Sequence, residues 1–454
     1  MNKQNDHVFY RDLTRAYPVV DRAEGVHIWD KTGKRYLDAT GGAVVVGIGH
    51  AVPEVLAAMF DQARRVCYAY NYQFTSEAQQ DLAAELADFA PGDLNYVYFV
   101  SGGSEGTETA IKLARSYFLE RGQPGKYKVI SRWRGYHGNT LGALSASGNV
   151  LRRRDYGPYL LDFKHISPPY CYRCFFGKEY PSCGLACAKD LERCILQEGP
   201  EQVAAFITET VGGASVAGMM PPPEYFPLVR EICDRYQVLL INDEVLCGVG
   251  RTGRNCAIDH WSVVPDMIVC AKGLSSGYSP IGAVIVREKV YETISEGSGA
   301  FEHGFTFGGN PLSCAVGLAV LRYIRKNDLV KRAADMGDYL LGQLKEELRD
   351  LPIVGDISGK GLLVGVELVQ NREDRQPIPR AYRASKRVVS ACFERGVIVL
   401  AGSGGQADGV NGDRLEIAPP YVIDPEDVDL LVSTLKDAVT QVGDELLTKA
   451  RGKA

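Results

Sequence analysis

The middle of the chain alternates short apolar runs with longer amphipathic stretches. The apolar runs are rich in Val, Ile and Leu, which is typical of strands that are buried on both faces. Alternation of such strands with helices is the signature of a parallel sheet covered by helices on both sides. We therefore predict an α/β fold, with strands at Tyr96–Val100, Lys128–Ile130, Ala204–Thr208, Val238–Asn242, Met267–Cys270 and Ala283–Val286.

The two ends of the chain follow different patterns. Near the N-terminus, Val26–Asp30 and Arg35–Asp38 flank a four-residue turn and predict a hairpin. The glycine-rich segment 401–413 predicts an irregular, mobile loop. The C-terminal third predicts a long helix at 327–351, a strand at 362–368, further short elements at 392–400 and 414–417, and a closing helix at 425–449. We predict a large domain at 66–329 and a small α+β domain built from both chain ends, 1–65 and 330–454.

Composition and charge exclude several classes of function. The chain has 454 residues, of which 45% are hydrophobic, and can bury a large core. Its net charge of −5, from 51 basic and 56 acidic residues, gives no indication of a nucleic-acid-binding surface. The polar start, residues 1–6, has no apolar signal region, and no run of about 18 apolar residues predicts a membrane span. These features predict a cytoplasmic protein.

Twelve cysteines are many for such a protein, and four of them cluster in the sequence. A CxxC pair followed by a second, looser pair resembles a four-thiolate zinc site. The alternative is a set of reduced thiols in a surface excursion, and we assign no metal. The four residues are Cys171, Cys174, Cys183 and Cys187.

Two apolar runs end in side chains of opposite charge. The run that starts at Val238 ends in Asp243, and the run Met267–Ala271 ends in Lys272. Neighbouring parallel strands would bring the acid and the amine to one sheet edge, where α/β enzymes keep their chemistry. Pyridoxal phosphate (PLP) needs such a lysine for an imine and an acid opposite its pyridine nitrogen. The alternatives are a surface lysine and a helix-capping or salt-bridging acid.

The segment Ser101–Thr107 lies between a predicted strand and the helical run Glu105–Phe118. Glycines at 102 and 103 let the backbone approach an anion, and the helix N-terminus offers free N–H groups. Ser104 adds a hydroxyl, so the segment suits a single phosphate, but it lacks the spacing of the nucleotide-binding motifs. A tight strand-to-helix turn with a serine N-cap explains the pattern equally well.

Three further side chains follow predicted strands. Tyr136 or His137 could stack on a flat ring held over the sheet edge, or could be plain packing residues. Glu209 closes the strand Ala204–Thr208 and could hydrogen-bond near a cofactor or substrate; the alternative is a solvated strand end.

Several motifs, in this order along almost the whole chain, resemble the class III pyridoxal-phosphate aminotransferases. The resemblance implies the aspartate-aminotransferase fold, which is PLP-dependent fold type I with a mostly parallel seven-stranded sheet. It also implies a homodimer, or a tetramer, with the active site shared between subunits. The motifs are Gly41–Ala43, Gly49–His50, Gly103–Glu105, Glu108–Lys112, Tyr136–Gly138, Leu240–Val245, Lys272–Gly273, His303–Pro311 and Ala418–Pro420.

The resemblance implies a role for individual residues. Gly103 and Ser104 would hold the phosphate, and Thr306 would reach the phosphate of the neighbouring subunit. Lys272 would form the internal aldimine. Around the cofactor ring, the residues implied are Tyr136 with His137 beside it, Glu209, Asp243 at the pyridine nitrogen, and Val245 on the opposite face.

The chain also departs from the family pattern. Relatives usually have Glu-Pro followed by Gln-Gly, where this chain has Glu209-Thr-Val-Gly-Gly213. Many relatives carry a carboxylate-binding arginine shortly before the Pro-Pro, and here Glu416 occupies the nearest matching place. Arg414 is the available substitute, because arginine binds a carboxylate through two parallel hydrogen bonds. The alternative for Arg414 is a surface arginine that begins a strand.

The sequence thus predicts a ping-pong aminotransferase that moves an amino group from an amine or amino acid to a keto acid, pyruvate or 2-oxoglutarate, through Lys272. An amino-acid racemase or a decarboxylating aminotransferase would share every cofactor motif. A non-catalytic α/β protein is a further alternative, and it would be colourless. The identity of the donor does not follow from the sequence.

Overall fold

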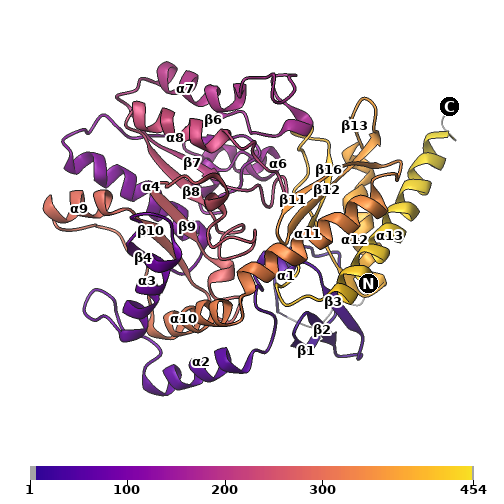
Figure 1. Cartoon of the computed structure of the whole chain (residues 1–454), viewed down its shortest axis with the longest axis horizontal. Helices are drawn as coiled ribbons and strands as arrows, with labels where there is room; N and C mark the ends of the chain where they lie inside the picture. Colours follow the sequence, from indigo (N-terminus) through magenta and orange to yellow (C-terminus); the bar gives the residue numbers. More distant parts are fainter. Residues whose placement is uncertain (1–6, 452–454) are drawn as a thin grey trace.

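The computed structural model describes residues 7–451 and contains a seven-stranded sheet at the centre of its larger part (Figure 1). The strand order is β4-β10-β9-β8-β7-β5-β6. Neighbouring strands are parallel except that β10 runs antiparallel to both β4 and β9. The bounds are β4 Tyr96–Val100, β5 Lys128–Arg132, β6 Lys164–Ile166, β7 Val203–Glu209, β8 Leu239–Asp243, β9 Met267–Cys270 and β10 Gly282–Val286.

Helices cover both faces of this sheet, because alternate strand residues enter two different hydrophobic cores. On β8, Leu240 packs into one core, and Leu239 and Ile241 pack into the other. The first core is closed by α3 Glu77–Phe89, α7 Ala186–Glu198, α8 Tyr225–Arg235 and α10 Pro311–Lys326, and the second by α4 Gly103–Glu120 and α9 Glu288–Glu296. Three short helices and α2 complete this region: α1 Gly41–Val44, α2 Pro53–Arg65, α5 Leu141–Ala146 and α6 Val150–Arg153.

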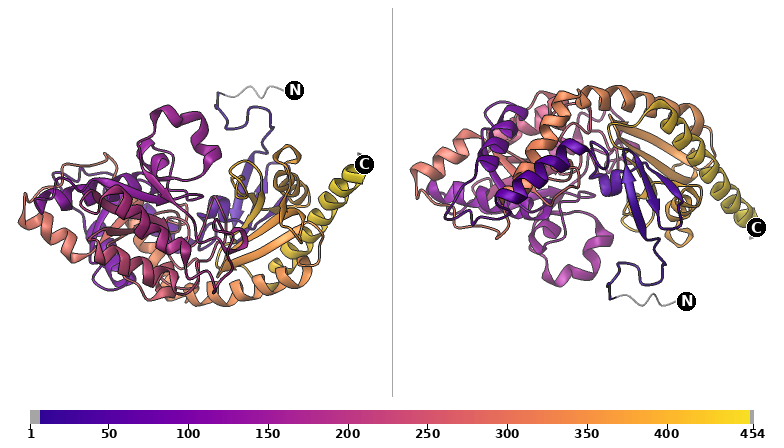
Figure 2. Two further views of the ribbon diagram at one scale, coloured as in Figure 1. Left: turned by 90° about the horizontal axis from the view of Figure 1, so that it is seen from above. Right: turned by 90° about the horizontal axis from the view of Figure 1, so that it is seen from below.

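The smaller part of the molecule contains both ends of the chain (Figures 1 and 2). A four-stranded sheet pairs the N-terminal strands β1 Val20–Glu24, β2 His27–Asp30 and β3 Arg35–Asp38 with β14 Val397–Ile398. A second sheet is formed by β11 Val354–Lys360, β12 Leu363–Asn371, β16 Asp413–Ile417 and β15 Leu400–Ala401, with β13 Gln376–Pro377 beside β12. The helices here are α11 Leu329–Leu348, α12 Ala384–Glu394 and α13 Pro425–Arg451.

The structure confirms the predicted α/β class, the six strands of the central sheet to within a few residues, and the N-terminal hairpin. One strand, β6, was missed because Lys164–Ile166 is a short edge strand with two polar residues. The stretch 392–400, predicted as a short element, contains the end of α12 followed by β14. The domain boundaries stay a prediction, and the polar start 1–6 lies outside the described residues.

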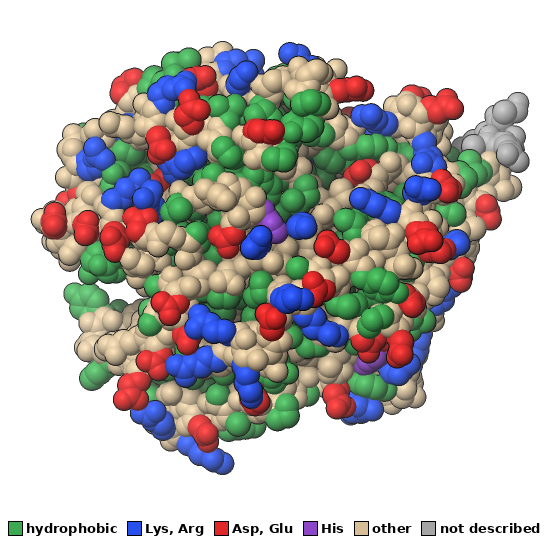
Figure 3. All heavy atoms as spheres, in the orientation of Figure 1, with side chains coloured by type: hydrophobic (Ala, Val, Ile, Leu, Met, Phe, Trp, Pro, Cys, Tyr) green, Lys and Arg blue, Asp and Glu red, His purple; other side chains and the backbone are tan. Residues whose placement is uncertain are grey.

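The surface has a mixed charge pattern. On the face drawn in Figure 3, basic and acidic side chains alternate over most of the area. Between residues 7 and 451, no helix is long and apolar enough to cross a membrane.

Candidate active site

Lys272 and Asp243 line the same cavity, which has a volume of about 150 Å³. Asp243 is the last residue of β8, and Lys272 follows the end of the neighbouring parallel strand β9. The Lys272 backbone has a φ of +42°, a left-handed conformation that is unfavourable for a residue with a side chain. The turn after β9 thus brings the amine to the sheet edge at which β8 presents its acid.

The Asp243 carboxylate is buried and held from two sides. Its Oδ2 lies 2.7 Å from Nδ1 of His137, and its Oδ1 accepts a 3.0 Å hydrogen bond from the backbone N–H of Val245. The other ring nitrogen of His137 is buried and has no partner among the described residues. These contacts fix the orientation of the carboxylate at the cavity wall.

The Lys272 amine is in an environment that favours its neutral form. Burial lowers the pKa of Lys272, and the negative charges of Glu416, Asp243 and Glu209 oppose this shift only in part. An amine is a nucleophile only after it loses its proton. The site therefore favours the form of Lys272 that attacks a carbonyl carbon.

The N-terminus of α4 forms another wall of the cavity through Gly103 and Ser104. The first N–H groups of a helix have no intrahelical partner and can bind an anion. A side chain at Gly103 would lie 2.7 Å from Cγ1 of Val245, so only glycine fits there. The N-cap residue of α4 is Gly102, and no side chain accepts a hydrogen bond from the first N–H groups of the helix. The Oγ of Ser104 instead accepts a hydrogen bond from the backbone N–H of Asn139. The serine N-cap alternative is therefore wrong.

Glu209 and Tyr136 are joined at the opposite wall. The Glu209 carboxylate is buried and accepts 3.0 Å hydrogen bonds from the backbone N–H groups of Tyr136 and Gly213. Burial raises the pKa of Glu209, and the neighbouring His137 opposes the shift. Glu209 is thus not a solvated strand end, and its side chain fixes the loop that carries Tyr136.

Comparisons with known proteins identify the family. Residues 10–439 match the family model described as aminotransferase class III. The chain belongs to the class III aminotransferases. It is 36% identical to a putrescine–pyruvate aminotransferase of Pseudomonas aeruginosa, over 96% of this chain and 94% of that protein. It is 35% identical to a diaminobutyrate–2-oxoglutarate transaminase of Halomonas elongata, over 94% and 91%.

Solved structures show the same fold. An amine transaminase from an uncultivated Pseudomonas species, solved in a PLP-bound form, superposes with a TM-score of 0.88 at 33% identity. The match covers 96% of this chain and 97% of that one. Class III aminotransferases use PLP, and the predicted family and fold are confirmed.

Arg414 of this aminotransferase does not face the cavity as a free cation. Its side chain is fully buried, and Nη1 lies 3.1 Å from Oδ2 of Asp356 and 3.3 Å from Oε2 of Glu367. Its Nε donates to the backbone oxygen of Ala217 at 2.6 Å, and Nη2 to Oγ of Ser358. These contacts do not fit a substrate-binding role for Arg414, because its charge and donors are already used within the protein. They also exclude a surface arginine.

Replacing Arg414 by methionine is therefore expected to lower stability. The change removes one of the two cations that contact the buried Glu367, the other being Arg173, and it also removes the cation beside Asp356. We expect a loss of about 1–3 kcal/mol of unfolding free energy. Denaturant unfolding at fixed cofactor concentration measures the loss, and the double variant with Glu367→Gln should recover part of it. If the unfolding midpoint of Arg414→Met is normal and its KM for the keto acid is raised, Arg414 binds the substrate after all.

The four clustered cysteines lie around a small cavity of about 20 Å³ in this aminotransferase, beside Tyr170. Burial raises the pKa of Cys171 and of Cys187, the latter to about 12. Within the part of the chain that the structure describes, no three His, Cys, Asp or Glu side chains are placed to hold a metal ion.

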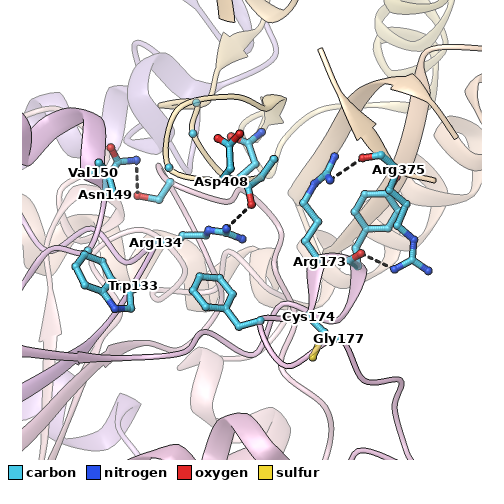
Figure 4. A pocket seen from close by; sticks show the side chains of 18 of the residues that line it. Trp133, Arg134, Asn149, Val150, Arg173, Cys174, Gly177, Arg375 and Asp408 are labelled. Atoms are coloured by element: carbon cyan, nitrogen blue, oxygen red, sulfur yellow. Dashed lines mark hydrogen bonds between the residues drawn. The ribbon is translucent and has the colours of Figure 1, made fainter. Parts of the chain in front are cut away.

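A larger cavity, of about 780 Å³, lies outside the Lys272 site (Figure 4). The glycine-rich loop forms one of its walls, and Arg134 ties that loop to the sheet edge through a 2.8 Å hydrogen bond to Ala407 O. Arg173 and Arg375 lie against Tyr172 on another wall. None of the predicted cofactor residues lines this cavity.

Thr306 is exposed and does not line the Lys272 cavity of its own chain. A role in a neighbouring subunit is compatible with this position, and it stays a prediction.

The sequence did not predict two charged residues near the site of this aminotransferase. Arg152 was missed, and Glu416 was given no role. The guanidinium of Arg152 lies 4.6 Å from the centre of the Tyr136 ring, and its Nε donates to Oγ of Ser403. Glu416 is 4% exposed, and its Oε1 has no hydrogen-bond partner among the described residues. Arg152 gave no sequence signal, because a loop contact rather than a motif brings it to Tyr136. The presence of Glu416 in place of an arginine could be read from the sequence, but the burial of its side chain could not.

Proposed function

We propose that this class III aminotransferase transfers an amino group from an amine or amino acid to a keto acid, pyruvate or 2-oxoglutarate, with Lys272 as the catalytic residue and PLP as cofactor. The observation that carries the proposal is the single cavity into which adjacent parallel strands bring Lys272 and Asp243. The activities of the two relatives, with pyruvate and with 2-oxoglutarate as acceptors, support the choice of acceptor.

The residues of the cavity fit PLP. Gly103, Ser104 and the N-terminus of α4 would hold the phosphate, and Asp243, oriented by His137, would pair with the pyridine nitrogen. Tyr136 and Val245 lie on the cavity wall, where they would pack on the ring. When bound, PLP supplies an electron sink for the bonds at the donor carbon.

Lys272 has two roles in this proposal. Its Nζ would hold the cofactor covalently, which its lowered pKa favours. Once displaced by the donor, its free amine would be the base for the proton on the donor Cα. Asp243 would favour the protonated form of the cofactor nitrogen.

We further propose that Arg152 binds the carboxylate of the keto acid. Apart from the bond from Nε to Ser403, the guanidinium makes no side-chain hydrogen bond within residues 7–451. Its two terminal nitrogens are therefore available for a bidentate contact. It lies over Tyr136, which lines the Lys272 cavity.

Replacing Arg152 by alanine should raise the KM for pyruvate or 2-oxoglutarate about 10–100-fold, because a hydrogen-bonded charge pair is lost. Steady-state kinetics with varied keto acid measures the effect. The matched control is Arg154→Ala, which removes an exposed arginine two positions later. Equal KM values in both variants would remove Arg152 from this role.

A donor screen tests the proposed function. The purified protein, loaded with PLP, is incubated with a panel of amines and amino acids and with pyruvate or 2-oxoglutarate, and alanine or glutamate formation is measured. We expect formation that depends on both donor and keto acid. Chiral analysis of the donor and detection of CO₂ identify the two alternatives, a racemase and a decarboxylating aminotransferase. Absence of amino transfer with every donor would contradict the proposal.

We propose that the protein acts as a homodimer. Thr306 adjoins a group of exposed aromatic side chains, and soluble monomers rarely expose large apolar patches. Tyr68 packs edge to face against Phe307, and Asn71 donates a hydrogen bond to Gly308 O. These contacts hold the segment around Asn71 against the segment that follows Thr306. The exposed aromatic residues are Tyr68, Tyr70, Tyr72, Phe74 and Phe307. A second subunit covering this patch would place Thr306 at a shared site.

A further inference from the structure

Glu416 is a buried acid with an unsatisfied oxygen. Its side chain lies on β16, in the smaller part of the molecule, and is 4% exposed. The Oε1 atom makes no hydrogen bond with any described residue. A carboxylate oxygen that is removed from water without a partner costs free energy. Such an atom indicates a partner that arrives with a ligand.

The strand geometry shows which way Glu416 points. Side chains two residues apart lie on the same face of a strand, so Glu416 shares its face with Arg414. The Nε of Arg414 contacts the backbone oxygen of Ala217, in the segment that follows β7. This face of β16 is thus directed at the larger part of the molecule.

The chain after Glu416 returns to the Lys272 turn. The hydroxyl of Tyr421 donates to Val249 O at 2.8 Å and lies 3.6 Å from the Cβ position of Gly273. Two contacts flank Glu416 along the chain. Arg414 contacts Ala217, in the segment after β7, and Tyr421 lies beside the turn that carries Lys272. Burial raises the pKa of Glu416 and lowers that of Lys272, and each of the two charges opposes the other's shift more than any other charged group does.

The cations near Glu416 do not satisfy it. The donors of Arg251 are directed at backbone oxygens, those of Leu362, Pro419 and Val46. The Nε of Arg152 donates to Ser403, and its terminal nitrogens make no hydrogen bond to Glu416 among the described residues. Lys272 is the third nearby cation, and its ammonium would be consumed when the amine binds the cofactor.

We infer that Glu416 pairs with a second positively charged nitrogen of the amino donor, so that the preferred donors are diamines or related compounds with two ammonium groups. This inference rests on the proposed function. It assigns Glu416 as a specificity residue for the distal nitrogen of the donor.

The test compares donors that differ only in the distal charge. The PLP-loaded protein is assayed with diamines of three to six carbons and with the amino alcohols of the same length, all with pyruvate. We expect the best diamine to exceed its amino alcohol in kcat/KM by roughly 30-fold or more, the lower limit for a buried charge pair. In Glu416→Gln this ratio should fall by about the same factor, while kcat/KM for the amino alcohol changes less than about threefold.

A matched control is Glu426→Gln, an exposed glutamate in the first turn of α13, which should keep the wild-type ratio. The wild-type comparison alone decides the question if Glu416→Gln fails to fold. Equal kcat/KM for a diamine and its amino alcohol overturns the inference, as does an unchanged ratio in a folded Glu416→Gln variant. Loss of transfer with every donor in the wild type would instead contradict the proposed function.

Discussion

The variant Lys272→Ala is expected to lose turnover by roughly 10⁴-fold or more and to lose the visible absorbance of the loaded enzyme. Lys272 is the amine that the cavity places opposite Asp243, and alanine can neither bind a carbonyl carbon nor accept a proton. Steady-state assays and an absorbance spectrum measure both losses. Far-UV circular dichroism should stay unchanged, because the substitution removes a charge that is costly to bury.

The matched control is Lys345→Ala, which removes an exposed lysine of α11 and should keep both the activity and the spectrum. Wild-type turnover in a folded Lys272→Ala protein would remove Lys272 from the reaction. A colourless wild-type protein after loading with PLP would contradict the cofactor proposal itself.

The second large effect is expected for Asp243→Asn, with kcat reduced roughly 10²–10³-fold, the scale of losing one preorganised electrostatic contact. Asparagine is nearly isosteric with aspartate, so the wall of the cavity should keep its shape. It lacks the negative charge that keeps a pyridine nitrogen protonated. Kinetics of the loaded variant measure the effect, and a spectrum of the bound cofactor reports the change of protonation independently.

Asp350→Asn, at an exposed aspartate, is the control for Asp243→Asn and should have the kcat and the spectrum of the wild type. A near-normal kcat in Asp243→Asn, with the cofactor bound, would mean that Asp243 only orients His137 and does not act on the cofactor nitrogen.

Local patterns predicted most of the central sheet. Strands such as Met267–Cys270 are buried on both faces, so their apolar runs are continuous and bounded by polar residues. The juxtaposition of Asp243 and Lys272 followed from the same pattern, because neighbouring parallel strands end at one edge. The edge strand β6 lacks that burial and could not be recognised.

The surroundings of the residues considered for substrate binding could not be predicted in the same way. Arg414 and Glu416 are two residues apart on one strand face, yet one is surrounded by acids and the other has an unpaired oxygen. Their environments depend on contacts with segments that are far away in sequence, such as Asp356 and Ala217. Arg152 likewise reaches Tyr136 through tertiary packing.

The pairing of β3 with β14 has a consequence for the order in which the chain folds. Leu37 on β3 pairs with Val397 on β14. During synthesis, the edge of β3 therefore stays uncovered until nearly all of the polypeptide has left the ribosome. Closing so long a loop is slow and leaves a strand edge open to other chains in the meantime. Nascent protein truncated before β14 would thus be prone to aggregation through this hairpin.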